Sequence, residues 1–393
     1  MLNVVIAADS FKGSATSIEV ADYLEVGMLK ANAQLTVVKV PIADGGEGTV
    51  KCVIAARNGT MLKETVSGPV GDPQEAFWGL IDKSTAIIET AEIVGLPILG
   101  KRLDIAHAST YGIGELILRI LDYGVKTIYI GLGGSATNDA GVGMAQALGI
   151  QFKDSDGREI ERGVSSISRL NEIEYSKLDP RLKQTKVIGL SDVDNPLTGL
   201  KGATAIFGPQ KGATPEQVKV YDDSLVHLSK LVSQHKGTDD SVYPGAGAAG
   251  GLGYGIMSFL NGEIKSGISE VMKIVHLKER IKEADLVITG EGRIDNQSLG
   301  GKVPVGVASL AKKLNKSVVA VVGGVGDGAE RVYETGIDLV IPTTNRPMTV
   351  DEAVDKVGDL ISGTGFTLVK ALQLGAKLNV ECPTKFTQDS GLV

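Results

Sequence analysis

Residues 127–141 read TIYIGLGGSATNDAG, in which a run of mostly β-branched residues ends in glycines and is followed by short polar side chains. Apolar residues then recur with helical spacing, so the stretch predicts a strand, a tight loop and a helix. Backbone N–H groups point outward at a helix N-terminus, where the helix dipole also favours negative charge. We therefore expect the loop to bind an anion, and the residues predicted to contact it are Gly133, Gly134, Ser135, Thr137 and Asn138.

The amino-acid composition indicates which kinds of ligand and partner the protein can have. The 393 residues carry a net charge of −7, which argues against non-specific nucleic-acid binding but allows a locally basic site for a small anion. Two cysteines are too few for a disulfide framework and lack the spacing of metal ligands. The chain starts directly with an apolar strand, and no apolar run reaches the ~18 residues of a membrane span. We expect a cytoplasmic protein with no membrane or nucleic-acid partner, and the oligomeric state stays open, a homo-oligomer included.

Strand and helix patterns alternate along much of the chain, which predicts α/β architecture with a parallel sheet. Short alternating strands and glycine- and proline-rich turns break this rhythm and indicate antiparallel β-structure. We predict a Rossmann-like parallel-sheet domain interrupted by a smaller mixed α/β domain, with the active-site cleft between them. The main domain is expected to comprise 1–61, 107–193 and 266–376, the inserted domain 62–106 and 194–265, and a C-terminal tail 377–393.

The glycine-rich loop fits one sequence pattern of nucleotide binding loosely, and a second pattern, the P-loop, is absent from the sequence. Residues 131–136 fit the loose dinucleotide fingerprint G-x-G-x-x-G/A, and so do residues 245–250. Glycine makes up 51 of the 393 residues, about twice the usual ~7%, so chance matches are expected and the pattern is weak evidence for NAD. No P-loop sequence G-x-x-x-x-G-K-[ST] occurs. A chain that transfers phosphate must therefore use another arrangement.

Acidic residues follow several of the predicted strands. Since ligands bind beyond the carboxyl ends of parallel strands, such loops can converge on one site. Phosphoryl transfer needs carboxylates to hold Mg²⁺, cations to neutralise developing charge and a base near the acceptor hydroxyl. We predict Asp192, Asp194 and Glu291 as metal ligands, and Asp192, Asp295 or Asp44 as the base.

Lysines on glycine-flanked loops supply the cations. Lys12 lies in the loop after the first strand and Lys211 in the sequence FGPQKG, and Lys12 or Lys211 is predicted to offset charge on the transferring phosphoryl group. The four histidines do not cluster with these loops, which disfavours a histidine metal site or a Ser-His-Asp hydrolase.

Seven motifs occur in an order that resembles the bacterial type-1 glycerate kinase family. They are DSFKGS (9–14), ADGGEGT (43–49), GLGGSATNDAG (131–141), SDVDNPL (191–197), FGPQKG (207–212), GAGAAGGLG (245–253) and TGEGRIDNQS (289–298). The resemblance implies ATP-dependent phosphorylation of D-glycerate with Mg²⁺, usually to 2-phosphoglycerate, by a two-domain α/β enzyme with its site in the interdomain cleft. The segment past about Lys377 is not part of the resemblance.

The roles of individual residues are predicted from the chemistry of their side chains and not from the resemblance. The 133–138 loop is expected to bind either an ATP phosphate or the glycerate carboxylate, and Glu291 to contribute to the ATP site as well as to the metal. Asp192 or Asp295 would orient or deprotonate the acceptor hydroxyl. The alternatives are 3-phosphoglycerate as product, an NAD-dependent hydroxy-acid dehydrogenase, or a non-catalytic sensor of a small acid.

Overall fold

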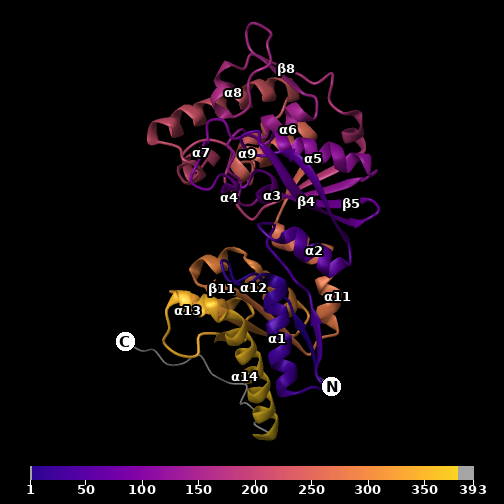
Figure 1. Ribbon diagram of the computed structural model, residues 1–393, viewed down its shortest axis with the longest axis vertical. Coiled ribbons are helices and arrows are strands. Elements are labelled where there is room, and N and C mark those ends of the chain that lie inside the picture. The colour runs from indigo at the N-terminus through magenta and orange to yellow at the C-terminus, as the bar shows by residue number, and fades with distance from the viewer. Residues whose placement is uncertain (1, 379–393) are drawn as a thin grey trace.

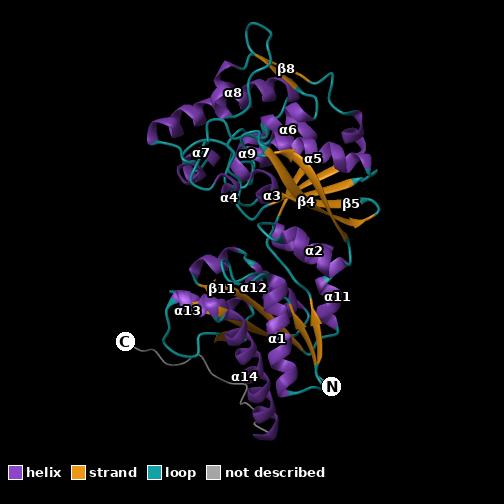
Figure 2. Cartoon of the chain, viewed as in Figure 1, coloured by secondary structure: helices purple, strands orange, loops and turns teal. Residues whose placement is uncertain are grey.

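The chain folds into two lobes stacked along the long axis of the molecule, and the first and last described helices, α1 (Ser17–Ala31) and α14 (Val357–Leu378), lie in the lower lobe (Figure 1). The computed structural model describes residues 2–378. Each lobe is built on its own β-sheet, and helices pack around both sheets (Figure 2). No helix within the described residues is long and apolar enough to cross a membrane.

The lower lobe contains a parallel sheet with the strand order β13-β12-β11-β1-β2. Its strands are β1 (Asn3–Ile6), β2 (Thr36–Lys39), β11 (Leu286–Ile294), β12 (Ser317–Val325) and β13 (Leu339–Pro342). The inner strands are nearly continuous valine and isoleucine runs, because helices cover both faces of the sheet. α1 (Ser17–Ala31) and α14 (Val357–Leu378) cover one face, and α12 (Val303–Lys313) packs on the other.

Local sequence explains where α1 begins. Thr16 accepts a hydrogen bond from the backbone N–H of Glu19, whose side chain accepts one from the backbone N–H of Thr16. This capping box satisfies two backbone donors that would otherwise lack partners. It therefore fixes the start of α1 directly after the loop that follows β1.

The upper lobe contains a mixed sheet with the order β10-β9-β6-β5-β4-β3. Its strands are β3 (Thr60–Ser67), β4 (Pro73–Asp82), β5 (Thr85–Glu89), β6 (Thr127–Gly131), β9 (Lys186–Leu190) and β10 (Glu263–Lys265). The first three pair antiparallel and the last four parallel. A separate antiparallel pair is formed by β7 (Gln151–Lys153) and β8 (Glu172–Glu174).

Helices of the upper lobe surround this sheet, and α2 (Thr49–Arg57) lies at the waist between the lobes (Figure 1), where α10 (Gly267–Ile274) contacts α2, β9 and α12. The upper helices are α3 (Thr90–Val94), α4 (Leu96–Leu99), α5 (Tyr111–Asp122), α6 (Val142–Ala147), α7 (Ala203–Phe207), α8 (Pro215–Lys236) and α9 (Ala248–Leu260). α11 (Leu277–Lys282) follows α10 along the chain, and the lower lobe adds α13 (Val350–Asp355). Short 3-10 turns are η1 (Val164–Arg169), η2 (Pro180–Gln184), η3 (Pro209–Lys211), η4 (Asp240–Val242), η5 (Asn296–Gly300) and η6 (Ala329–Thr335).

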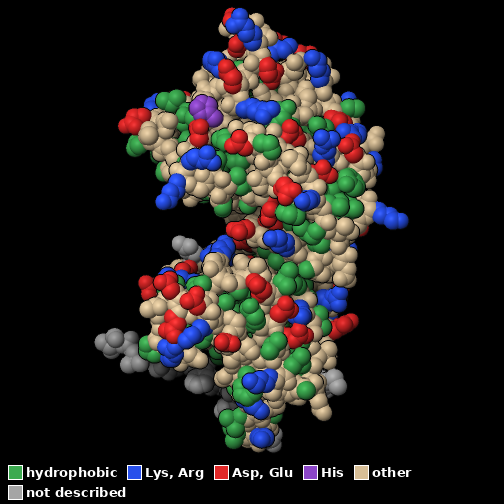
Figure 3. Space-filling model, in the orientation of Figure 1, with side chains coloured by type: hydrophobic (Ala, Val, Ile, Leu, Met, Phe, Trp, Pro, Cys, Tyr) green, Lys and Arg blue, Asp and Glu red, His purple; other side chains and the backbone are tan. Residues whose placement is uncertain are grey.

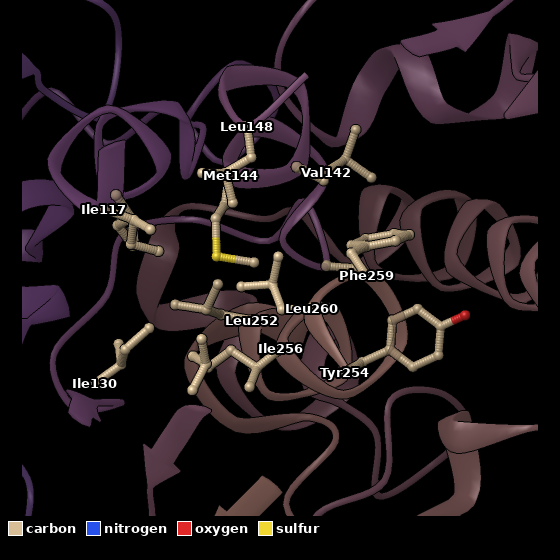
Figure 4. Packing of buried hydrophobic residues seen from close by; sticks show 14 of the residues in the cluster. Ile117, Ile130, Val142, Met144, Leu148, Leu252, Tyr254, Ile256, Phe259 and Leu260 are labelled. Carbon is tan, nitrogen blue, oxygen red and sulfur yellow. The ribbon is translucent and has the colours of Figure 1, made fainter. Parts of the chain in front are cut away.

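Side chains of α5, α6 and α9 pack together in the core of the upper lobe. Figure 4 shows the side chain of Met144 directed toward Leu252 and Leu260. All three side chains belong to one buried apolar cluster that also includes Ile130 at the end of β6. The strand that opens the glycine-rich loop is therefore anchored in this core.

The predicted α/β fold with a parallel sheet is confirmed, but one predicted boundary is wrong. We assigned 107–193 to the main domain, whereas β6 and β9 belong to the upper sheet together with β3–β5. A buried parallel strand looks the same in either sheet, and the pairing of β6 with β5 is a long-range choice that the local pattern does not encode. The predicted tail also starts too early, since α14 continues to Leu378; the remainder, 379–393, lies outside the described residues.

Candidate active site

A cavity of 720 Å³ lies at the carboxyl ends of the lower sheet. The chain moves from β1 to β2 on one side and from β11 to β13 on the other, so the strand order reverses between β1 and β11. In open α/β sheets ligands bind at such a reversal. The charged residues that line the cavity are Asp9, Lys12, Asp44, Glu291, Arg293 and Lys302.

Asp9, in the loop after β1, is a buried carboxyl that the sequence analysis missed. Burial, reinforced by the charges of Asp44 and Glu291, raises the pKa of Asp9 to about 7. The backbone N–H of Ser10 donates to its carboxylate at 2.7 Å. Asp9 lies in the loop after a strand, as Asp44 does, and that shared position was the signal that would have identified it.

Glu291 is held in place by two partners. The hydroxyl of Ser298 donates a hydrogen bond to its carboxylate, and Lys302 Nζ lies 3.8 Å from Glu291 Oε2. Burial raises the pKa of Glu291 above its usual range. Asp295, predicted as a base, instead forms an ion pair with Arg293 at 3.4 Å, and its side chain lines neither this cavity nor the one described next.

A second cavity of 500 Å³ lies between the lobes. Asp192 and Asp194 line it from the loop after β9, and Gly300 and Gly301 line it from the lower lobe. Figure 3 shows the notch between the lobes, with acidic and basic side chains at its rim.

The carboxylate of Asp192 is oriented by α10. It accepts hydrogen bonds from the hydroxyl of Ser266 at 2.7 Å and from the backbone N–H of Ile268 at 3.1 Å. The residue keeps solvent exposure, but protein atoms crowd its carboxylate, and this desolvation raises its pKa. The charge of Asp44 acts in the same direction.

Gly267, at the start of α10, lies between Asp44, which lines the first cavity, and Asp192, which lines the second. A Cβ on Gly267 would collide with the carbonyl oxygen of Asp44 and would lie 3.1 Å from Asp192 Oδ2. Only a glycine allows the loops after β2 and β9 to approach this closely. Asp44 and Asp192, from different lobes, are consequently neighbours.

The predicted metal ligands do not form one cluster. Asp192 and Asp194 line the cavity between the lobes, whereas Glu291 lines the other. Within residues 2–378 no group of three or more His, Cys, Asp or Glu side chains is arranged to hold a metal ion alone. Mg²⁺ typically uses one or two carboxylates together with substrate phosphates and water. The carboxyl oxygens of Asp9, Asp44 and Glu291 fit that donor requirement.

The first half of the 131–141 loop packs at the waist. A Cβ on Gly133 would lie 2.7 Å from the α-carbon of Gly46, and one on Gly131 would press against the carbonyl of Gly45. Gly134 is exposed and has a φ of 70°, a conformation that favours glycine. These glycines thus allow two backbone loops to touch beside Asp44.

The second half of the loop is buried, and its helix end is already occupied. Asp139 accepts hydrogen bonds from the backbone N–H groups of Thr110 at 2.8 Å and Gly143 at 3.2 Å, and burial raises its pKa. The carboxylate at the start of α6 therefore belongs to the chain itself. This corrects our expectation that the helix N-terminus is open to a ligand.

Lys211 lies in the interior of the upper lobe. Its Nζ donates to Ser135 Oγ at 2.9 Å and to the carbonyl oxygen of Thr137 at 2.7 Å, and burial lowers its pKa to about 7. Asn138 is fully buried and donates to Thr204 Oγ1 at 2.9 Å. Four predicted contact residues, all within the described part of the chain, line neither of the two cavities, and they are Ser135, Thr137, Asn138 and Lys211. Their hydrogen bonds instead stabilise the 131–141 loop.

Glu89 performs a similar task at the waist. Its carboxylate accepts hydrogen bonds from the backbone N–H groups of Gly48, at 2.9 Å, and Val50 at the start of α2. Burial raises the pKa of Glu89 to about 7. Sequence analysis missed this residue, although its place at the end of β5 matched the strand-end pattern used for the other acids.

Comparison with known proteins agrees with the seven motifs. Residues 4–373 match the glycerate kinase family. The glycerate 2-kinase of Escherichia coli is 43% identical over 378 residues, 96% of this chain and 99% of that protein. The glycerate kinase of Halalkalibacterium halodurans is 42% identical over 363 residues, 92% of this chain and 96% of the relative.

A solved structure agrees in fold. The putative glycerate kinase 2 from Salmonella typhimurium superposes with a TM-score of 0.87 at 39% identity, covering 96% of this chain and 99% of that chain. The family match spans nearly all described residues, including both lobes and both cavities. The resemblance inferred from the motifs is confirmed, and the chain belongs to the glycerate kinase family.

Proposed function

We propose that the protein catalyses the ATP-dependent phosphorylation of D-glycerate to 2-phosphoglycerate, with Mg²⁺ as the metal. The observation that carries this proposal is the close approach, at Gly267, of Asp44 from one cavity and Asp192 from the other. One cavity combines lysines with carboxylates, as a nucleotide–metal complex requires. The other places Asp192 beside the space for an acceptor alcohol.

In this arrangement ATP occupies the cavity of the lower lobe, where Lys12 and Lys302 neutralise charge on its phosphates. Mg²⁺, held by carboxylates among Asp9, Asp44 and Glu291, would offset charge on the phosphate oxygens. Glycerate lies in the cavity between the lobes. Asp192 accepts the proton of the acceptor hydroxyl while that oxygen bonds to the γ-phosphorus and the bond to the ADP oxygen breaks.

The choice of the 2-hydroxyl follows the E. coli relative, which is named glycerate 2-kinase. The dehydrogenase alternative is set aside because the chain belongs to a kinase family and because Asp139 fills the helix end that a dinucleotide would use.

A coupled assay tests the proposal with purified protein, ATP, Mg²⁺ and D-glycerate. We expect ADP release that depends on all three components and a ³¹P spectrum of the product that corresponds to 2-phosphoglycerate. Absence of ADP release above background contradicts the kinase activity. A spectrum of 3-phosphoglycerate contradicts only the regiochemistry.

A further inference from the structure

The cavity of the lower lobe changes character from one end to the other. Its charged residues lie in β11 and in the loops after β1, β2 and β11, whereas the described residues that line it from β12 onward carry no charge. Those uncharged residues are Gly323, Gly324, Val325, Thr343, Thr344, Met348, Thr349, Val350, Ala353, Val354 and Val357. A ligand that fills the whole cavity therefore meets charged groups of both signs at one end and uncharged, mostly apolar residues at the other.

Two of these apolar side chains are largely exposed. Val350, at the start of α13, is 79% exposed, and Val325, at the end of β12, is 56% exposed. Both side chains face the same cavity. Single exposed apolar residues need no explanation, but several that gather in one concave site are typical of a small-molecule pocket.

The open space around Gly324 is a second, independent indication of a ligand at this end of the cavity. A Cβ there would meet no atom within 4 Å, and its φ is not in the left-handed region. Neither packing nor backbone conformation requires glycine at this position, in contrast to Gly323, where a Cβ would collide with the carbonyl of Gly292. What a side chain at Gly324 would fill is the cavity itself.

The charged and uncharged ends of the cavity are far enough apart for one nucleotide to span them. Neighbouring strands lie about 4.8 Å apart, so β13 and β1 are roughly 14 Å apart across three spacings. A nucleoside triphosphate laid along the strand ends would reach from one to the other.

We propose that the adenine base of ATP lies over Gly324 against α13, and that the triphosphate runs along the strand ends toward Lys12 and Lys302. This assignment rests on the proposed function. It places the base on the lower lobe alone, so nucleotide binding does not require glycerate or the upper lobe. The base contacts apolar side chains and backbone, and the charged contacts belong to the phosphates.

Two variants test the base site. Gly324→Leu fills the floor of the cavity, and Val350→Asp places a negative charge against the base at a position that is exposed and at the first turn of a helix, where Asp is tolerated. We expect each to raise the KM for ATP by about tenfold or more, equivalent to about 1.4 kcal/mol, with the KM for glycerate unchanged. Titration of ADP into enzyme without glycerate, followed by calorimetry, should show the same loss.

Matched controls separate ligand binding from folding. Gly363→Leu changes another glycine that meets no atom within 4 Å, and Val26→Asp changes another exposed valine, 59% exposed, on α1. Both controls should bind ADP like the wild type. Unchanged ADP binding in both cavity variants, or an increase confined to the KM for glycerate, overturns the assignment. Because ADP binding is measured without turnover, a wild-type enzyme that binds ADP but lacks glycerate kinase activity would contradict the proposed function and not the base site.

Discussion

Asp192 accepts a hydrogen bond from the hydroxyl of Ser266 at 2.7 Å, so residues at the ends of two adjacent strands, β9 and β10, fix one carboxylate. The backbone N–H of Ile268 fixes its second oxygen. A catalytic base needs this kind of orientation, because proton transfer requires hydrogen-bond reach to the substrate hydroxyl. Its raised pKa also makes it a stronger base than an ordinary exposed aspartate.

Replacement of this carboxylate tests its role. Asp192→Asn should lower kcat by about 100-fold or more, since a positioned general base contributes roughly that much. The amide keeps an oxygen for one of the two hydrogen bonds, so the fold should be retained, which circular dichroism checks. A folded variant with kcat within a few-fold of the wild type would remove Asp192 from the mechanism.

Lys12 should matter through its charge on the phosphates. Lys12→Ala removes a cation from the loop after β1, and we expect kcat/KM for ATP to fall by about 100-fold, as for other groups that stabilise developing charge. Steady-state kinetics measure this, with Lys278→Ala, an exposed lysine on α11, as control. Equal kinetics for the two variants would argue against a phosphate contact.

Lys12, Asp44 and Glu291 could be grouped from the sequence because Lys12 and Asp44 lie in the loops after β1 and β2 and Glu291 lies in the carboxyl-terminal half of β11, all in one parallel sheet. Strand ends of such a sheet share one edge, so a local pattern suffices to bring their side chains together. The same argument placed Asp192 at the site, although its strand belongs to the other sheet.

Lys211 shows where this reasoning fails. A lysine between glycines resembles a loop residue that reaches a ligand, but the start of α9 buries the surrounding region. Gly250 packs against the carbonyl of Thr137, the same carbonyl that Lys211 contacts, and Ala249 to Gly251 adopt left-handed φ values to do so. These contacts join segments more than 70 residues apart, which no local pattern encodes.

Asp9 should make stability depend on pH. Its pKa is about 7 in the folded protein and 3.8 as a model value, so its contribution to stability is full below pH 4 and is lost as the pH rises through 7. Asp9→Asn keeps the acceptor oxygen for Ser10 and removes the charge. The variant should gain stability over the wild type between pH 5 and pH 8, by up to about 4 kcal/mol at 1.36 kcal/mol per pKa unit.

Urea unfolding at several pH values measures this difference, and comparison at equal pH cancels the contributions of Glu89 and Lys211. The same variant should lose most of its kinase activity if Asp9 is one of the carboxylates that hold Mg²⁺, as proposed above. A stability difference that does not change with pH would show that Asp9 is ionised across this range.

Removal of metal should abolish activity and spare the fold. Within residues 2–378 no side-chain group is arranged to hold a metal alone, so the ion is expected to arrive with the nucleotide. Excess EDTA should stop ADP release, added Mg²⁺ should restore it, and the Tm of the nucleotide-free protein should shift by less than about 2 °C. A large loss of Tm in EDTA would instead indicate a structural metal.

Asp139 should be needed for the fold of the upper lobe. Besides three backbone donors, at 2.8, 3.2 and 3.3 Å, the hydroxyl groups of Thr110 and Ser109 donate to its carboxylate at 3.0 and 3.2 Å. Asp139→Ala leaves these donors buried without an acceptor, and each unsatisfied group costs roughly 1–3 kcal/mol. We expect the free energy of unfolding to fall by about 3 kcal/mol or more.

Asp139→Asn provides the matched variant, because it retains one acceptor oxygen and should lose less stability than the alanine variant. Both are measured by urea unfolding, with ADP binding as a second readout. Since the adenine site is assigned to the lower lobe, ADP affinity should survive in either variant as long as the protein is folded. A loss of ADP binding without a loss of stability would mean that the 131–141 loop contacts the nucleotide directly, as the sequence alone had suggested.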